Sequence, residues 1–165
     1  MAKLKVAFIG LGVMGYPMAG YLSRAGFDTK VYNRTSAKAD KWVKEYQGKA
    51  CDTPRGASEN CDIVFVCVGN DDDVRSVVYG DEGILAGLKA DAMLVDHTTT
   101  SADLAVELAK ACDKYGNHFI DAPVSGGQAG AENGVLTIMC GGEQTIFERV
   151  SPVMDVYAKQ VTLLG

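Results

Sequence analysis

The sequence lacks any apolar run long enough to span a membrane, and its N-terminus lacks the apolar stretch and cleavage site of a signal peptide. It also lacks an excess of basic residues, because 16 Lys and Arg face 21 Asp and Glu, for a net charge of −5. Nucleic-acid-binding proteins usually carry a basic face. We therefore expect a cytoplasmic protein without membrane or nucleic-acid partners.

Cysteine pairs with metal-ligand spacing are missing as well. The chain has five cysteines, an odd number, and no Cys-x-x-Cys pair. Cys67 and Cys140 lie in apolar, strand-like runs, so we expect reduced, buried thiols rather than a metal or redox site. The acidic run at 71–73 could suggest a cation site. We expect it instead to open a helix, where carboxylates suit the positive end of the helix dipole.

What is present is the alternation of strands and helices that a parallel sheet requires. The chain has 165 residues, 47% of them apolar and 22% charged, which is typical of one globular domain. Alternating strands and helices imply right-handed crossovers and an α/β fold. The predicted strands are 5–9, 29–33, 62–68, 93–95, 119–120, 134–140 and 161–164. The predicted helical segments are 13–25, 35–47, 54–60, 74–79, 101–114 and 143–154.

A glycine-rich loop, Gly10-Leu11-Gly12-Val13-Met14-Gly15, joins the first predicted strand to the first helix. Gly10 permits a tight turn, Gly12 lets a pyrophosphate approach the backbone, and Gly15 lets the helix pack close to the strand. The helix N-terminus adds free N–H groups for phosphates. A purely structural turn is the alternative. In its strand–helix context, the loop predicts a Rossmann-type doubly wound fold, mostly parallel, with helices on both faces and a bound nicotinamide cofactor.

The end of the second strand lacks the Asp or Glu that binds the ribose 2′-OH in NAD sites. Asn33, Arg34 and Thr35 stand there instead. An Arg can pair with a 2′-phosphate, and Asn33 and Thr35 can add hydrogen bonds. We therefore favour NADP, with NAD as the alternative. Arg34 could also be simply an exposed residue at a helix start.

Further cofactor contacts are expected where later strands end, because ligands bind beyond the carboxyl ends of a doubly wound sheet. These positions are Val68 and Gly69 after one strand and the threonines at 98–100 after another. Helix capping is the alternative role for the threonines. We expect His97 and His118 to be structural or solvated, since neither has a visible catalytic partner.

A second glycine-rich loop follows the predicted strand at 119–120. Ser125, Gly126 and Gly127 offer a hydroxyl and unhindered N–H groups at the start of a helix, an arrangement that suits a carboxylate. A plain connection between strand and helix is the alternative.

Two stretches of the chain resemble the β-hydroxyacid dehydrogenase family, which includes 3-hydroxyisobutyrate dehydrogenase, tartronate semialdehyde reductase and glyoxylate/succinic semialdehyde reductases. They are the run from Phe8 to Ala19 and the run from Asp121 to Gly142. The resemblance covers essentially the whole chain, but only the cofactor domain of the family. It implies that Ser125, Gly126 and Gly127 form the substrate-binding signature.

The resemblance also implies roles for single residues around the cofactor. Val68 and Gly69 match a pair that lies against it, although many members have Leu-Pro there, so the contact of Gly69 would be through backbone only. Asp73 stands where many members place an Asn near the cofactor. Thr99 matches a threonine beside the nicotinamide half. The run 33–35 is similar to that of NADP-preferring semialdehyde reductases.

The chain ends directly after an apparent core strand, at Gly165. We expect it to be the first domain of a longer protein, a single dinucleotide-binding domain over residues 1–165, rather than a compact protein with a buried tail. The resemblance implies that the catalytic Lys and an all-helical second domain, which usually dimerises, lie beyond that point. The chain alone would then bind the cofactor with very little turnover.

The function expected from the resemblance is an NADP-binding domain of an oxidoreductase. The whole enzyme would transfer hydride between nicotinamide and a short, carboxylate-bearing β-hydroxyacid or aldehyde acid, and would be a homo-oligomer. Two alternatives stay open. One is a non-catalytic dinucleotide-binding module. The other is an imine-reductase-like domain, against which the run at 121–127 argues.

Overall fold

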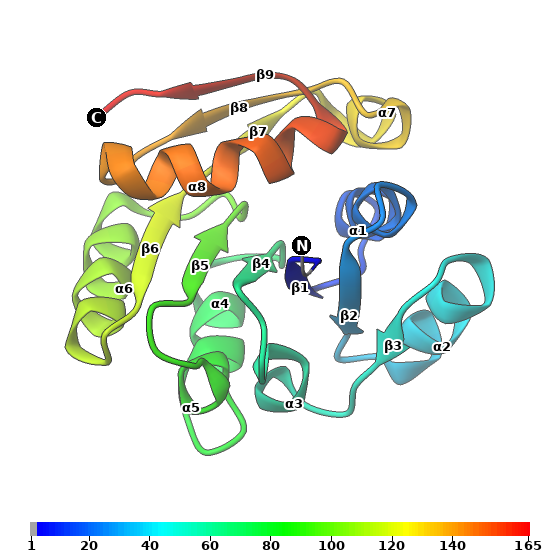
Figure 1. Ribbon diagram of the computed structural model, residues 1–165, viewed down its shortest axis with the longest axis horizontal. Helices are drawn as coiled ribbons and strands as arrows, with labels where there is room; N and C mark the ends of the chain where they lie inside the picture. Colours follow the sequence, from blue (N-terminus) through cyan, green and yellow to red (C-terminus); the bar gives the residue numbers. More distant parts are fainter. Residues whose placement is uncertain (1–2) are drawn as a thin grey trace.

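The computed structural model describes residues 3–165, which form a six-stranded sheet and a smaller three-stranded one (Figure 1). The large sheet has the order β3-β2-β1-β4-β5-β6, and all of its paired strands are parallel. Its strands are β1 (Lys5–Ile9), β2 (Asp28–Tyr32), β3 (Lys49–Ala50), β4 (Ile63–Val66), β5 (Met93–Asp96) and β6 (His118–Asp121). The strand order reverses between β1 and β4, which is the point where doubly wound sheets bind ligands.

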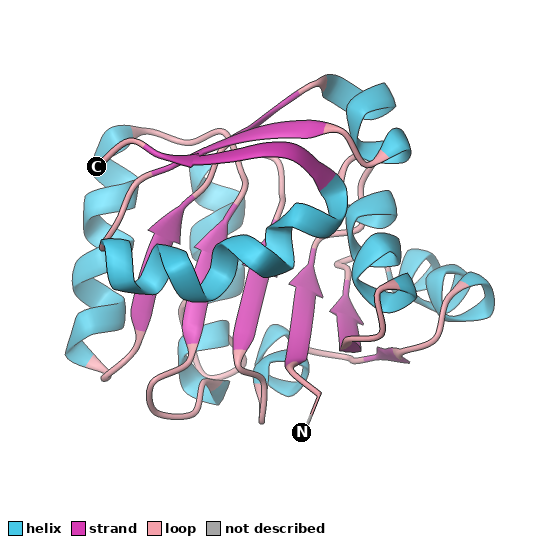
Figure 2. Ribbon diagram, turned by 45° about the horizontal axis from the view of Figure 1, so that its top comes forward, coloured by secondary structure: helices cyan, strands magenta, loops and turns pink. Residues whose placement is uncertain are grey.

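Helices cover both faces of the large sheet, and each face has its own hydrophobic core. One core joins β1 and β2 to helices that include α1, α2 and α8, and Figure 2 shows α8 crossing the parallel strands on this side. The other core lies under α3 to α6. The helices are α1 (Gly15–Arg24), α2 (Ser36–Glu45), α3 (Pro54–Ser58), α4 (Asp71–Val78), α5 (Ile84–Gly87), α6 (Ala102–Lys114), α7 (Gly127–Asn133) and α8 (Gln144–Met154).

Burial explains why the central strands are continuous apolar runs. Every residue of β4 and β5 is buried, including Asp96 at the end of β5. A parallel strand that is covered on both faces needs apolar side chains in both directions, so the sequence shows no alternation there. The predicted Rossmann-type doubly wound sheet is confirmed by the strand order and by the helices on both faces.

The smaller sheet has the order β7-β8-β9, with β7 (Val124–Ser125) antiparallel and β9 (Ala158–Leu163) parallel to β8 (Leu136–Cys140). A short 3₁₀ helix, Asp155–Tyr157, leads from α8 into β9. A single antiparallel bridge between Asp121 and Gly141 links the two sheets.

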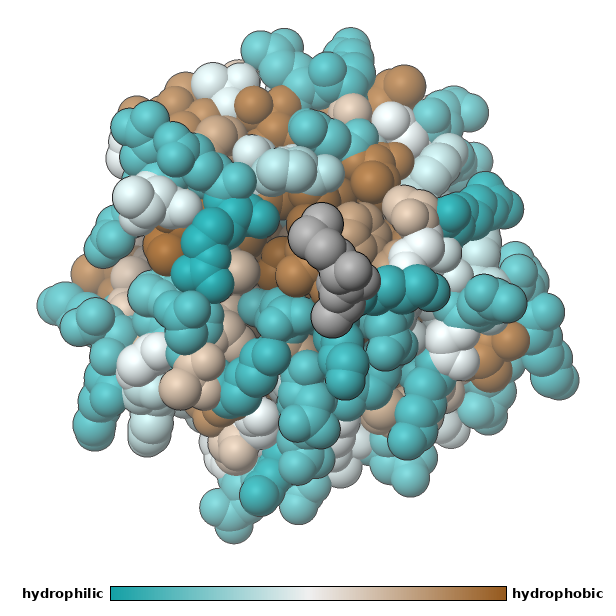
Figure 3. Space-filling view, in the orientation of Figure 1, coloured by the Kyte–Doolittle hydropathy of each residue, from teal (hydrophilic) through white to brown (hydrophobic). Residues whose placement is uncertain are grey.

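Figure 3 shows the molecular surface in the orientation of Figure 1, with most of the visible hydrophobic residues in the upper half of the view. Around β8 and β9 the exposed large hydrophobics are Val135, Met139 and Leu164.

Several local predictions need correction. The strands β3 and β7 and the helix α5 were not predicted, because runs of two to four residues carry no readable periodicity. Helix α4 begins at Asp71 rather than Val74, since the acidic run forms its first turn. The predicted helix at 101–114 agrees with α6, whose buried residues are Leu104, Leu108 and Cys112. The prediction that the carboxylates at 71–73 open a helix agrees with this structure.

Between residues 3 and 165, no helix is long and apolar enough to cross a membrane. Within the same range, no group of three or more His, Cys, Asp or Glu side chains is arranged to hold a metal ion. All five cysteines are free thiols. Cys51 and Cys67 are partly exposed rather than fully buried, because each follows the end of a strand instead of lying within one.

Candidate functional site

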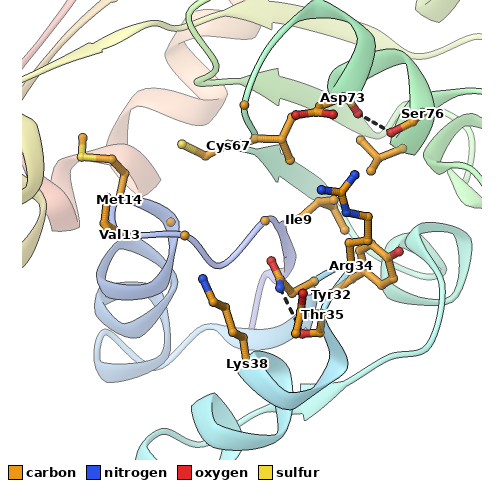
Figure 4. A pocket seen from close by; sticks show the side chains of 17 residues that line it. Ile9, Val13, Met14, Tyr32, Arg34, Thr35, Lys38, Cys67, Asp73 and Ser76 are labelled. Atoms are coloured by element: carbon orange, nitrogen blue, oxygen red, sulfur yellow. Dashed lines mark hydrogen bonds between the residues drawn. The ribbon is translucent and has the colours of Figure 1, made fainter.

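A cavity of about 410 Å³ lies at the carboxyl ends of β1, β2 and β4 (Figure 4). Its size falls within the range of small-molecule and cofactor sites. Three segments build it: the glycine loop after β1, the turn after β2 with the first turn of α2, and the loop after β4 with α4. Its lining residues are Ile9, Gly10, Gly12, Val13, Met14, Gly15, Tyr32, Asn33, Arg34, Thr35, Lys38, Cys67, Val68, Gly69, Asp73, Ser76 and Val77.

The glycine loop is packed tightly against the strands at two of its glycines and open at the third. Gly10 has φ +102°, and a Cβ there would lie 2.1 Å from the Cys67 carbonyl oxygen. A Cβ on Gly15 would lie 2.1 Å from the Gly10 oxygen. A Cβ on Gly12 would meet nothing within 4 Å, and Gly12 lines the cavity. The loop is therefore a cradle whose free space begins at Gly12, as a bound pyrophosphate requires.

Asn33 joins the glycine loop to the turn after β2. Its Oδ1 accepts a hydrogen bond from the Leu11 N–H at 2.8 Å, and its Nδ2 donates to the Thr35 carbonyl at 3.0 Å. Both ends of the amide are thus engaged within the protein. Asn33 lines the cavity as predicted, but its side chain fixes two loops rather than offering both ends to a phosphate.

Two cationic side chains reach the cavity from the segment after β2. In Figure 4 the Arg34 guanidinium points toward α4, and the Lys38 ammonium points toward the glycine loop. Thr35 stands at the N-cap position of α2, and its hydroxyl makes no capping hydrogen bond. Sequence reasoning missed Lys38. The available signal was its position three residues after Thr35, on the same face of the first helical turn.

The opposite wall comes from the loop after β4. Asn70 caps α4, with its Oδ1 accepting from the Asp73 N–H at 2.9 Å. This places the Asp73 carboxylate at the cavity, close enough to Gly69 that a Cβ there would lie 2.5 Å from Asp73 Oδ2. Cys67 also lines the cavity and was missed as a site residue. Burial raises the pKa of its thiol to about 12, so it stays protonated at neutral pH.

Several predicted site residues lie outside this cavity. The Leu11 side chain is buried in the core, so only its backbone belongs to the loop. Thr99 is exposed in the loop after β5 and does not line the cavity. Ser125, Gly126 and Gly127 are exposed, with φ +131° at Gly126 and +62° at Gly127. The glycines do provide accessible backbone, but the structure does not bring them into the same cavity as the glycine loop.

His97 has the structural environment expected for it. Its Nδ1 lies 2.7 Å from the Ala122 carbonyl, which can only accept, so Nδ1 carries the proton. Nε2 then accepts from the Tyr157 hydroxyl at 2.7 Å. Burial lowers the pKa of His97 to about 4, which keeps the ring neutral. His118 is likewise engaged, with its Nε2 lying 2.6 Å from the Asp91 carboxylate.

Comparisons with known proteins identify the chain as a dinucleotide-binding domain. A family model described as the NAD binding domain of 6-phosphogluconate dehydrogenase matches residues 5–165. An uncharacterized oxidoreductase of Shewanella frigidimarina is 60% identical over 98% of this chain and 55% of its own. A probable 3-hydroxyisobutyrate dehydrogenase-like protein of Arabidopsis thaliana is 42% identical over 99% of this chain and 49% of its own. The 2-hydroxy-3-oxopropionate reductase of Escherichia coli is 36% identical, over 98% and 55%.

Solved structures of related proteins have the same fold. The 3-hydroxyisobutyrate dehydrogenase of Mycobacterium tuberculosis with L-serine has a TM-score of 0.92 at 27% identity, covering 99% of this chain and 55% of that one. Psf3 in complex with NADP+ and 2-OPP has a TM-score of 0.90 at 29% identity, over 96% and 56%. An imine reductase of Myxococcus stipitatus with NADP+ has a TM-score of 0.87 at 25% identity, over 98% and 55%.

The chain thus spans about half the length of the curated relatives it matches. The resemblance to 3-hydroxyisobutyrate dehydrogenases and related reductases is confirmed, with the match lying in their dinucleotide-binding half. Because the family model matches nearly every described residue, the chain belongs to the family of the NAD-binding domain of 6-phosphogluconate dehydrogenase.

Proposed function

We propose that this chain binds NADP(H) in preference to NAD(H) and forms the cofactor-binding half of an oxidoreductase. The observation that supports the preference is the wall of the cavity after β2. Arg34 and Lys38 both line it, and Asn33 replaces the carboxylate that would bind a ribose 2′-OH. Two cations favour the additional 2′-phosphate of NADP, and the missing carboxylate removes a repulsion.

The residues of the cavity fit the rest of a dinucleotide. The open backbone at Gly12 and the N-terminus of α1 suit a pyrophosphate. The loop after β4, with Val68 and Gly69, provides the wall toward the ribose and nicotinamide half. A bound nicotinamide dinucleotide would supply hydride chemistry, and the protein's part is to bind and orient it. Thr99, which lies just outside the cavity, is proposed to contact the nicotinamide half.

For the substrate we propose a short β-hydroxyacid or the corresponding aldehyde acid. The Ser125 hydroxyl and the exposed N–H groups of Gly126 and Gly127 would hold its carboxylate. The names of the Arabidopsis and E. coli relatives support this class of substrate. An imine reductase at 25% identity has a similar fold, and fold alone does not choose a substrate. The proposal therefore assigns the distinction between substrates to Ser125, Gly126 and Gly127.

The chain covers only about half of these relatives, so activity is proposed for the whole protein rather than for these 165 residues. We propose that the proton-transferring Lys comes from the part of the relatives that this chain does not cover, and that the whole protein is a cytoplasmic homo-oligomer. The isolated chain should therefore give no NADPH oxidation above background with succinic semialdehyde or glyoxylate. Turnover comparable to that of a full-length relative would contradict this proposal.

The cofactor preference is tested by titrating the chain with NADPH and NADH and following nicotinamide fluorescence. Arg34→Ala and Lys38→Ala should each weaken NADPH binding by about 10-fold to 100-fold, the usual value of a charge-assisted hydrogen bond. NADH binding should change by less than about 3-fold, since NADH has no 2′-phosphate. Lys44→Ala is the matched control, because Lys44 is exposed on the same helix outside the cavity. Equal losses for both cofactors would exclude a 2′-phosphate contact.

A further inference from the structure

The loops that follow β4 and β5 are tied together at two points. Near the strands, the Thr98 hydroxyl accepts a hydrogen bond from the Val68 N–H at 3.0 Å. Farther out, the Asp71 carboxylate accepts from the Ser101 N–H at 3.0 Å and from its hydroxyl at 2.6 Å. Ser101 also caps α6 by accepting from the Leu104 N–H. The segment 98–101 is therefore held at both ends against the wall of the cavity.

The tie at Val68 extends to the glycine loop. A Cβ on Gly10 would lie 2.9 Å from Val68 Cγ1 and 2.1 Å from the Cys67 oxygen, so Gly10 already packs directly on this segment. Cys67 and Val68 also line the cavity. A shift of the segment 67–69 would therefore change both the cavity wall and the support beneath the glycine loop.

Thr98 is itself anchored by a buried carboxyl group. Its backbone N–H donates to Asp96 Oδ1 at 2.9 Å, and Asp96 is only 1% exposed. Within residues 3–165, Asp96 Oδ2 has no hydrogen-bond partner. Burial raises the pKa of Asp96 to about 6, although hydrogen bonds from Thr98 oppose this shift. A half-satisfied buried carboxyl group is costly, and packing of the strand does not require one.

We propose that Thr98 is a positioning residue for the cofactor cavity and that Asp96 holds Thr98 in place. Thr98 lies behind the cavity and does not line it, so it acts through the Val68 N–H and, beyond that, through the packing on Gly10. The proposal rests on the proposed cofactor function of the cavity. It also gives a reason for a threonine at this position, because a valine of the same shape would leave the partly buried Val68 N–H without this acceptor.

The test compares the NADPH affinities of three variants, and urea unfolding checks that each variant is folded. Thr98→Val should weaken NADPH binding by at least about 5-fold, since a displaced wall costs binding energy without removing a direct contact. Thr98→Ser keeps the hydroxyl and should restore affinity to within about 2-fold of the parent. Thr29→Val is the control, because Thr29 is also buried, at 1% exposed, but donates to the Phe27 carbonyl away from the cavity. Equal affinities of the Thr98→Val and Thr29→Val variants would overturn the proposal.

A second measurement needs no variant and covers the case in which Thr98→Val does not fold. The Val68 amide should exchange with deuterium as slowly as the amides of β4, because its acceptor is 2% exposed. Exchange at the rate of an exposed loop would contradict the tie. If the parent chain binds neither NADPH nor NADH, the proposed function fails, whereas slow exchange at Val68 would still report the tie itself. If the parent binds and the valine variant binds equally well, only the positioning role fails.

Discussion

The two glycine-rich loops of this protein each join a strand to a helix, but the strands belong to different sheets, β1 to the large one and β7 to the small one. The two loops also differ in what they pack against. The loop at 10–15 is packed on the ends of β1 and β4, and a Cβ at Gly10 would overlap the Cys67 carbonyl. At the loop 125–127, the nearest atom to a Cβ on Gly126 would be Leu136 Cδ2 at 3.2 Å, with backbone atoms no closer than 3.6 Å, and a Cβ on Gly127 would meet nothing within 4 Å.

The first loop is therefore held by close packing on the backbone after β4, whereas the second loop has few close neighbours. The first loop helps to enclose a cavity of about 410 Å³, whereas Ser125, Gly126 and Gly127 are exposed. The proposed dinucleotide side is thus a preformed cavity. The proposed substrate side presents its hydroxyl and N–H groups on the surface.

The largest expected effect comes from Gly10→Ala. The substitution forces an L residue to φ +102° and a Cβ to 2.1 Å from a backbone oxygen that cannot move freely. We expect a loss of about 3 kcal/mol or more in the free energy of unfolding, measured by urea denaturation. Gly126→Ala is the matched variant in the other loop. It should cost about 1–2 kcal/mol, from the strain of an L residue at φ +131°, because its closest neighbour is a flexible side chain and the backbone stays at 3.6 Å or more. Equal costs would remove the contrast between the loops.

Gly12→Ala separates binding from stability within the first loop. Its methyl group would enter open space at the cavity, so the free energy of unfolding should change by less than about 1 kcal/mol. NADPH affinity should fall by at least about 10-fold, because the methyl group occupies the approach of the pyrophosphate. Fluorescence titration measures the affinity. Unchanged NADPH binding would show that the open space at Gly12 is not where phosphates bind.

Asn33→Asp tests the link between the glycine loop and the turn after β2. An aspartate can still accept from the Leu11 N–H, but it cannot donate to the Thr35 carbonyl, and it adds a negative charge at the cavity. The ratio of NADPH to NADH affinity should fall by about 10-fold. Asn60→Asp, an exposed change of the same charge outside the cavity, should leave that ratio unaltered. The idea fails if both variants behave alike.

The smallest expected effect is a change in the pH dependence of stability. The folded pKa of His97, about 4, lies below its unfolded value near 6.5, so its contribution is lost as pH falls from about 6.5 to 4. The folded pKa of Asp96, about 6, lies above its unfolded value near 3.9, so its contribution is lost as pH rises from about 4 to 6. These opposite slopes partly cancel in the parent protein.

Asp96→Asn should therefore make the free energy of unfolding rise more steeply with pH between about 4 and 6. Urea unfolding at several pH values measures the slope. Burial also raises the pKa of Asp121, the register partner of Asp96, so Asp121→Asn is a second variant that should change the slope in the same direction. A shallower slope in the Asp96→Asn variant would contradict the upward shift of the Asp96 pKa.

Much of the fold could be predicted because its signals are local. The predicted strand at 62–68 contains β4, an apolar run whose residues are all buried. The predicted helix at 101–114 agrees with α6, which Ser101 caps through its hydroxyl. The glycine spacing at 10–15 indicated the tight turn between β1 and α1. The very short elements β3, β7 and α5 could not be predicted, since their pairing partners rather than their own periodicity define them.

The site was only partly predictable for a related reason. Arg34 and Val68 were expected at the cavity, and both line it. Lys38 was missed because a lysine on an exposed helical turn looks the same whether or not a cavity lies beside it. Thr98 was grouped with its neighbours, since no local pattern shows which of three threonines turns inward to meet the Val68 N–H.

By itself the sequence determined the glycine loop at 10–15, its strand and helix, and the absence of a carboxylate after β2, because each depends on residues adjacent in the chain. Only the tertiary structure decided which residues share the cavity. The order of the parallel strands places β4 beside β1, although more than 50 residues of chain separate them, so Cys67 and Val68 close the wall beside Gly10. Such contacts depend on the packing of distant segments, which no local pattern records.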